Sequence, residues 1–294
     1  MTRAISQRWR RTYFNNPLIE ESLQHLPAAL SHPTSVEFRA YLTAKLHHSS
    51  AITRFRYAEY IAQRFSHDGR MNLDLARALA RFGDSRTGRE IFYFELIEAV
   101  PILKDTASLW LAEQDEAGAP RSALLSFLGP RLEGKQVERV AQAIVTALRR
   151  CRKLAPSKPA ILIPLRAEPP IEAFLYVLAR MFPERTMTRV DLFAATPEVR
   201  AMLWPRAALP GLLQAAMNAG HVSKVSELDQ YHQFTLADSG AARMELLLAE
   251  TASNGRVSTS PIRPADRRPR REQQAEQRSL FPPPQGSLFP KGGE

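Results

Sequence analysis

Apolar residues recur at every third or fourth position through the first part of the chain, and this period predicts a succession of short α-helices. Residues that can cap a helix mark the expected starts: Asn16 before Pro17, Thr34 with Glu37 in the spacing of a capping box, and the pair Ser49 and Ser50. A fourth helix is expected over residues 71–82. Short amphipathic helices with brief connections are typical of a compact helical bundle.

The helix that follows Ser50 is amphipathic, like its neighbours. We expect its apolar side chains to face the bundle, namely Ile52, Phe55, Ala58, Tyr60 and Ile61. Its arginines are expected to point outward, namely Arg54, Arg56 and Arg64. This helix should therefore pack against the bundle with its apolar side and expose its basic side to solvent.

Residues 86–114 are apolar on nearly every side of the predicted helix. A helix of this kind that is too short to cross a bilayer is expected to lie at the centre of a core. Pro101 cannot donate a backbone hydrogen bond, so the helix should break there and continue as a second leg over residues 102–111.

The stretch 134–165 combines an amphipathic helix with a β-arm. One helical stripe is apolar and holds Val137, Val140, Ala141, Ile144 and Leu148. The opposite stripe holds Lys135, Arg139, Gln142, Thr146 and Arg150. A basic join leads into strand-forming residues at 161–165, and a short helix at 122–128 precedes. This order is typical of a winged helix-turn-helix.

A winged helix of this kind can place its longer helix in the major groove of duplex DNA, with the wing and the basic join along phosphates. We therefore predict that the DNA contacts come from Lys135, Arg139, Gln142, Thr146, Arg149, Arg150, Arg152, Lys153 and Lys158. The alternative is that the same residues form the solvated face of an ordinary bundle helix.

The same order of elements returns further along the chain, without residue-for-residue similarity. Helices are expected over 171–182, 188–193 and 205–219, and two strands over 221–225 and 231–236 form a second wing. Gly220 should end the longer helix. Its outward side is poor in charge, so we interpret the second block as a packing or protein-contact module.

From residue 249 the chain is rich in Ser, Pro, Arg and Gln, which predicts a disordered basic tail. A phrase of the form Gln-x-Ser-Leu-Phe occurs twice in it. This phrase resembles the peptide with which bacterial polymerases and repair proteins bind the DNA sliding clamp. The resemblance implies clamp-binding roles for Gln277, Leu280, Phe281, Gln285, Leu288 and Phe289. The alternative is that the Leu-Phe pairs pack on the protein's own surface.

Charge and cysteine content narrow the class of partner and compartment. The chain holds 40 Lys and Arg against 30 Asp and Glu, giving a net charge of +10, which favours a polyanion as partner. With Cys151 as the single cysteine, an internal disulfide is excluded and a structural zinc site is not expected, as suits a cytoplasmic protein. No stretch has the length or pattern of a membrane span or a signal peptide, so we expect no membrane partner.

Residues that carry catalysis are not gathered in any recognisable motif. The glycines do not form a phosphate-binding loop, and the acidic residues are spaced singly. His47 and His48 lack the partners of a metal site. Cys151 lies among Arg149 to Lys153, which would lower its thiol pKa if it were exposed. We expect no catalytic residues, no metal, no cofactor and no enzymatic activity.

Three stretches together resemble the small A component of BREX phage-defence systems: residues 18–22, residues 101–107, and residues 140–154 with the following wing. The similarity covers roughly residues 17–237. It implies a helical N-terminal part, winged-helix character, DNA binding without catalysis, and other defence-system proteins as partners. The basic tail is not explained by this resemblance.

These observations predict a mainly α fold, in which an N-terminal helical bundle is followed by two winged-helix-like domains with short β-wings and a disordered tail. The predicted boundaries are 1–115, with a basic N-terminal arm, then 116–168, 169–248 and 249–294. The predicted function is non-enzymatic binding of duplex DNA in phage defence. Two alternatives stay open: an adaptor tethered to the sliding clamp, and a winged-helix transcriptional regulator.

Overall fold

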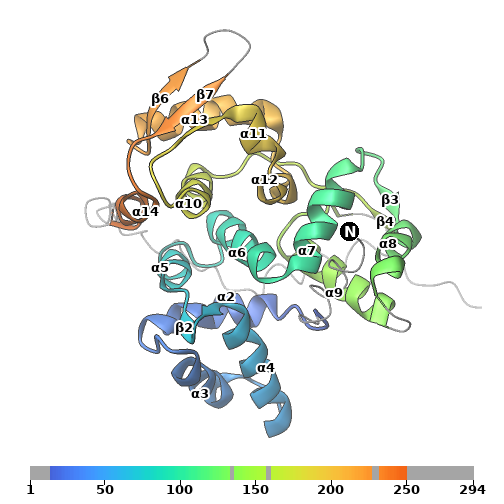
Figure 1. The fold of residues 1–294 in the computed structure, drawn as a ribbon. Helices are drawn as coiled ribbons and strands as arrows, with labels where there is room; N and C mark the ends of the chain where they lie inside the picture. The colour runs from blue at the N-terminus through green and yellow to red at the C-terminus, as the bar shows by residue number, and fades with distance from the viewer. Residues whose placement is uncertain (1–13, 133–135, 157–159, 227–231, 250–294) are drawn as a thin grey trace, which may run out of the picture. The chain divides into compact units, whose positions relative to one another are not determined.

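The computed structural model describes residues 14–132, 136–156, 160–226 and 232–249. The described residues belong to one compact unit, Met1–Ala252, and are mainly helical with a few short strands, which confirms the predicted fold class (Figure 1). Within this part of the chain, none of the helices has the length and apolar character needed to cross a membrane.

Two of the N-terminal helices begin at the predicted capping residues, Thr34 and Ser50, whereas the first begins at Ile19, two residues after the predicted Asn16-Pro17 start, and has no side-chain cap. The four helices are α2 (Ile19–His25), α3 (Ser35–Lys45), α4 (Ala51–Arg64) and α5 (Leu73–Phe82). A 3-10 turn (Leu26–Leu30) follows α2, and the strands β1 (Ser66–His67) and β2 (Arg70–Met71) pair between α4 and α5. The Thr34 capping box is formed in full, and the Ser50 hydroxyl accepts from the Thr53 N–H.

The prediction for the two sides of α4 was right for Ala58, Ile61 and Arg56 and wrong for other residues on both sides. Ile52 is 73% exposed and Phe55 52% exposed, and only Ala58, Ile61 and Ala62 are buried. Arg64 points inward: its guanidinium donates to the carbonyls of Pro17 (2.7 Å) and Asn16 (3.1 Å), and burial lowers its pKa to about 10. The N-terminal turn offers unpaired carbonyls at this place, and they satisfy the buried cation.

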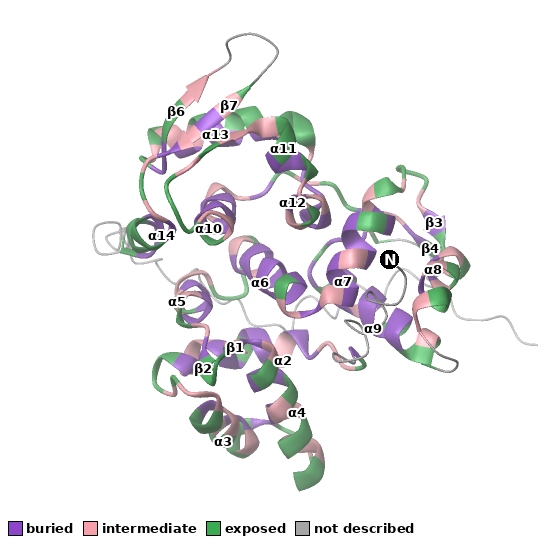
Figure 2. Ribbon diagram, in the orientation of Figure 1, coloured by how far each residue is buried: buried purple, intermediate pink, exposed green. Residues whose placement is uncertain are grey.

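Helix α6 (Arg86–Ala99) is the central helix, as predicted. Its residues 90–97 are all buried, and it packs against α5 and against helices from later in the chain (Figure 2). The break at Pro101 is also confirmed, because a new helix, α7 (Pro101–Asp105), starts there and continues through a π-turn (Thr106–Trp110) and a 3-10 turn (Leu111–Glu113).

The middle of the chain has the order of a winged helix. After α7 come β3 (Ala119–Pro120), α8 (Arg121–Leu128), a 3-10 turn (Gly129–Arg131), α9 (Gln136–Arg150) and β4 (Ile161–Leu162). Strand β4 pairs antiparallel with β3, and a bridge joins Leu154 to Pro164. The segments 153–155 and 163–165 are hydrogen-bonded to one another, and the strand predicted over 161–165 is limited to β4.

The order is repeated with a larger sheet in the next block. It runs α10 (Ile171–Met181), β5 (Met187–Arg189), α11 (Val190–Ala195), α12 (Pro197–Met202), a 3-10 turn (Arg206–Ala208), α13 (Leu209–Asn218), β6 (Val222–Ser226) and β7 (Gln233–Leu236). The strands form one antiparallel sheet in the order β5-β7-β6. A further helix, α14 (Gly240–Ala249), packs on α10 and was not predicted.

His221 follows the turn that ends α13, where Gly220 takes the predicted left-handed conformation (φ 78°). The imidazole is 1% exposed, neither ring nitrogen has a hydrogen-bond partner among the described residues, and burial together with Arg243 lowers its pKa to about 4. The folded protein therefore holds this ring neutral over a pH range in which the unfolded chain binds a proton.

The stability that comes from neutral His221 should be complete above pH 6.5 and should be lost as the pH falls toward 4. Allowing for screening by solvent, we expect a loss of about 2 kcal/mol across this range. Urea unfolding at pH 4.5 and pH 7 should show that His221→Phe loses less unfolding free energy at the lower pH than the wild type does. The same replacement of the exposed His67 should leave the wild-type dependence; equal behaviour of the two variants would contradict the expectation.

Candidate nucleic-acid interface

Helix α9 separates its apolar and cationic sides as the sequence predicted. Its apolar stripe is buried, including Val140, Ile144 and Leu148, whereas Arg139 and Gln142 are exposed. Thr146 is half-buried, and its hydroxyl donates to the Gln142 carbonyl (2.8 Å). No described side chain pairs with Arg139. Within the described part of the chain, the polar side of α9 is therefore exposed to solvent.

The turn at the end of α9 decides which of the basic residues face outward. Arg152 adopts the left-handed conformation (φ 56°), and the Lys153 N–H donates to the Leu148 carbonyl (2.7 Å), which closes the helix. Arg149, Arg150 and Arg152 are exposed at this turn. We call Arg139, Gln142, Arg149, Arg150 and Arg152 the α9 ridge.

Lys153 was predicted to contact DNA, and the structure contradicts this. The residue is 2% exposed, and its ammonium donates to both carboxylate oxygens of Glu90 (2.8 and 2.7 Å) and to the Met202 carbonyl (2.9 Å). It also lies 4.9 Å from the centre of the Tyr93 ring. The backbone reversal at Arg152 turns Lys153 into the core, where α6 supplies the counter-charge.

Cys151 is buried beside Lys153, whereas a lowered thiol pKa was expected only if this residue were exposed. Burial raises its pKa to about 12, against the opposing effect of the Lys153 and Arg89 cations. The thiol therefore stays protonated at neutral pH and packs as a small apolar group.

Carboxylates compete for only part of the α9 ridge. Glu20 lies 3.6 Å from the Arg150 guanidinium and also pairs with Arg89 (3.0 Å). Arg149 and Arg152 have no side-chain partner among the described residues. Two of the three arginines at the end of the helix are thus free to pair with an external anion.

Several predicted residues lie outside the described part of the chain. These are the ridge candidates Lys135 and Lys158 and the clamp-binding candidates Gln277, Leu280, Phe281, Gln285, Leu288 and Phe289. Their assigned roles stay predictions from the sequence.

The corresponding face of α13 carries amides and few charges. The Gln214 amide donates to the Asn218 side chain (3.4 Å), and Gly211, which is exposed, adds no side chain to this face. Arg206 and Lys224 are the neighbouring cations. This surface differs from the α9 ridge in charge, as the sequence indicated.

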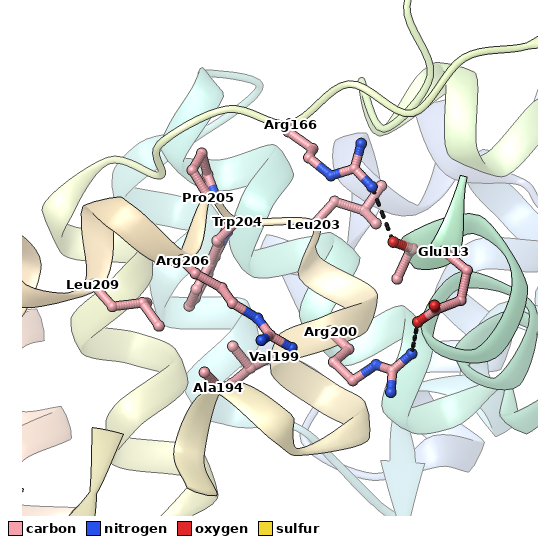
Figure 3. A pocket seen from close by; sticks show the side chains of 11 residues that line it. Glu113, Arg166, Ala194, Val199, Arg200, Leu203, Trp204, Pro205, Arg206 and Leu209 are labelled. Atoms are coloured by element: carbon pink, nitrogen blue, oxygen red, sulfur yellow. Dashed lines mark hydrogen bonds and ion pairs between the residues drawn. The ribbon is translucent and has the colours of Figure 1, made fainter. Parts of the chain in front are cut away.

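A pocket lined by three arginines was missed in the sequence. Arg166, Arg200 and Arg206 surround it together with Glu113 and Trp204 (Figure 3). The arginines come from the segment after β4, from α12 and from the turn before α13. Arg200 and Arg206 are close in the sequence, but Glu113 and Arg166 come from earlier parts of the chain, and only the folded chain reveals that they meet.

Comparisons with known proteins leave the family of this chain unassigned. No family model and no curated protein matches it. Two solved structures are similar, an SspB crystal structure at 12% identity and a magnesium-ion-bound SspB crystal structure at 11% identity. Each has a TM-score of 0.47 and aligns over 76% of this chain and 86% of that chain.

Proposed function

We propose that this protein is a non-enzymatic, duplex-DNA-binding component of a bacterial phage-defence system of the BREX type. The observation that carries DNA binding is the α9 ridge: Arg139, Gln142, Arg149 and Arg150 are exposed on α9, and Arg152 is exposed in the turn that ends it. The BREX assignment rests on the sequence resemblance over residues 17–237.

The length of α9 allows the two ends of the ridge to contact different parts of a DNA duplex. A helix of 15 residues is about 22 Å long, which exceeds the width of about 12 Å of the major groove. Arg139 and Gln142, in the first half, would then reach base edges or the groove wall. Arg149 and Arg152, at the far end, would pair with phosphates of the flanking strand. Arg150 should contribute less, because Glu20 already lies beside it.

Salt dependence tests this surface directly. Replacing Arg149, Arg150 and Arg152 together by glutamine should weaken duplex binding about 30-fold near physiological salt. The slope of log affinity against log salt should shrink by about 2 to 3, because the phosphate contacts of Arg149 and Arg152 and the weaker one of Arg150 are lost. Fluorescence anisotropy with a labelled duplex at several salt concentrations measures both quantities.

The matched control replaces the exposed Arg56 and Arg185 by glutamine, since these lie on α4 and on the segment after α10. It should bind as the wild type does. An unchanged salt slope in the triple variant would remove the α9 ridge from the proposal. One tight operator sequence, in place of broad affinity for duplexes, would favour the transcriptional regulator.

A second candidate function is an adaptor held at the sliding clamp. It is favoured by the two Gln-x-Ser-Leu-Phe phrases, because an apolar pair on a polar, proline-rich segment is suited to a partner's pocket. Two copies would raise the effective concentration on a ring with several sites. This function is compatible with DNA binding by α9.

A further inference from the structure

The arginine pocket shares no lining residue with the α9 ridge and is built from three segments of the chain, residues 112–113, Arg166 and residues 194–209. It has a volume of about 200 Å³ and is bordered by Glu113, Arg166, Arg200, Trp204, Arg206 and Leu209 (Figure 3). Three guanidinium groups and one carboxylate give its walls an excess of positive charge. Cations gathered on one concave surface raise the local concentration of anions.

Two of the three arginines are held in place by the protein itself. Arg166 donates to the carbonyls of Ala112 (2.9 Å) and Gln114 (2.6 Å), and Arg200 pairs with the Glu113 carboxylate. These contacts fix the positions of both side chains. A guanidinium carries five N–H donors, so each of the two retains donors for a ligand.

Arg206 is the third arginine, and no described residue pairs with it. In Figure 3 its side chain extends along the pocket toward Arg200. Asp191, which borders a neighbouring hollow with Arg206, already accepts from Arg189 at 3.0 and 2.5 Å. The positive charge of Arg206 is therefore not neutralised by that carboxylate.

The backbone at the edge of the pocket adds to this field. Helix α13 begins at Leu209, and no side chain caps its first turn. The Leu209 N–H already donates to the Arg206 carbonyl, and Pro210 has no N–H, so the start of the helix contributes only its dipole, which favours an anion close by.

We propose that this pocket binds a phosphoryl group, which the three arginines grip while it displaces Glu113 from Arg200. The small volume suits a phosphate and leaves no room for a whole nucleotide. The indole of Trp204 is 6% exposed and donates inward to Glu90 (3.3 Å), so little of its ring surface is open for a base to stack on. Glu113 is largely exposed and can turn into solvent when the anion enters.

The test uses the full chain and inorganic phosphate as the probe, titrated calorimetrically in a low-salt buffer free of other multivalent anions. Arg206→Gln should weaken phosphate binding about tenfold, because a charge-assisted contact is lost. Glu113→Gln should strengthen it, because the competing carboxylate is removed. Arg56→Gln, on α4, is the matched control and should equal the wild type.

Duplex binding of Arg206→Gln then separates two sources of the phosphoryl group. Weaker duplex binding that phosphate also competes away indicates a backbone phosphate, whereas unchanged duplex binding indicates a free phosphate ligand. The α9 triple variant should keep the phosphate affinity of the wild type, so the pocket does not depend on the ridge. Equal phosphate binding by Arg206→Gln and Arg56→Gln, or none by the wild type at about 10 mM, would overturn the proposal.

Discussion

Replacing Lys153 by methionine is expected to lower the free energy of unfolding by about 3–5 kcal/mol. The substitution leaves the Glu90 carboxylate buried, with the Trp204 N–H (3.3 Å) as its remaining side-chain hydrogen-bond donor among the described residues. A carboxylate in that position must either stay charged without a counter-ion or take up a proton. Chemical denaturation of the wild type and the variant at pH 7 measures the difference.

A double variant separates the effect of the Lys153–Glu90 ion pair from the effect of the volume that the two side chains fill. Glu90→Leu combined with Lys153→Met removes both charges while keeping similar volume, so most of the lost stability should return. The double variant should also keep the salt slope of duplex binding, because Lys153 is buried and makes no phosphate contact. A Lys153→Met protein as stable as the wild type, or a smaller salt slope in the double variant, would contradict this account.

Replacing Glu95 by leucine is expected to cost about 3 kcal/mol, since three donors converge on this buried carboxylate. They are the Tyr176 hydroxyl, the Arg180 Nε and the Asn72 amide, each at 2.8 Å. Burial raises the Glu95 pKa, and Arg180 and Tyr176 oppose that rise. Without the carboxylate, the buried Tyr176 hydroxyl loses its partner, whereas Arg180 can turn to solvent.

Tyr176→Phe is the matched comparison for Glu95→Leu. It removes one donor and leaves Glu95 with Arg180 and Asn72, so the expected cost is about 1 kcal/mol. Denaturant midpoints of the two variants at pH 7 test the order. If the two variants were equally stable, the three donors on Glu95 would together contribute no more to stability than the Tyr176 hydrogen bond alone.

Glu90 and Glu95 give the central helix α6 a role beyond apolar packing. Glu90 binds the turn that ends α9 and the segment after α12, through Lys153 and Trp204. Glu95 binds α10 and the start of α5, through Tyr176 and Asn72. Two buried carboxylates on one helix thus fix the end of α9 relative to α10 and α5.

The sequence by itself determined the local structure. Thr34 and Ser50 cap their helices, Pro101 interrupts the central helix, and Val140, Ile144 and Leu148 form the buried stripe of α9. Each of these features depends on residues within one or two turns, so the pattern along the chain contains the information. The mainly α fold and the repeated order of helices and strands follow from the same local patterns.

The tertiary structure decided where the charges go. Lys153 and Arg64 lie inside because Glu90 and the Pro17 carbonyl, 63 and 47 residues away in the chain, meet them there. Ile52 and Phe55 lie outside, although their spacing resembles that of core residues. The arginine pocket joins three distant segments. A buried charge is stable only beside its partner, and the fold alone brings such partners together.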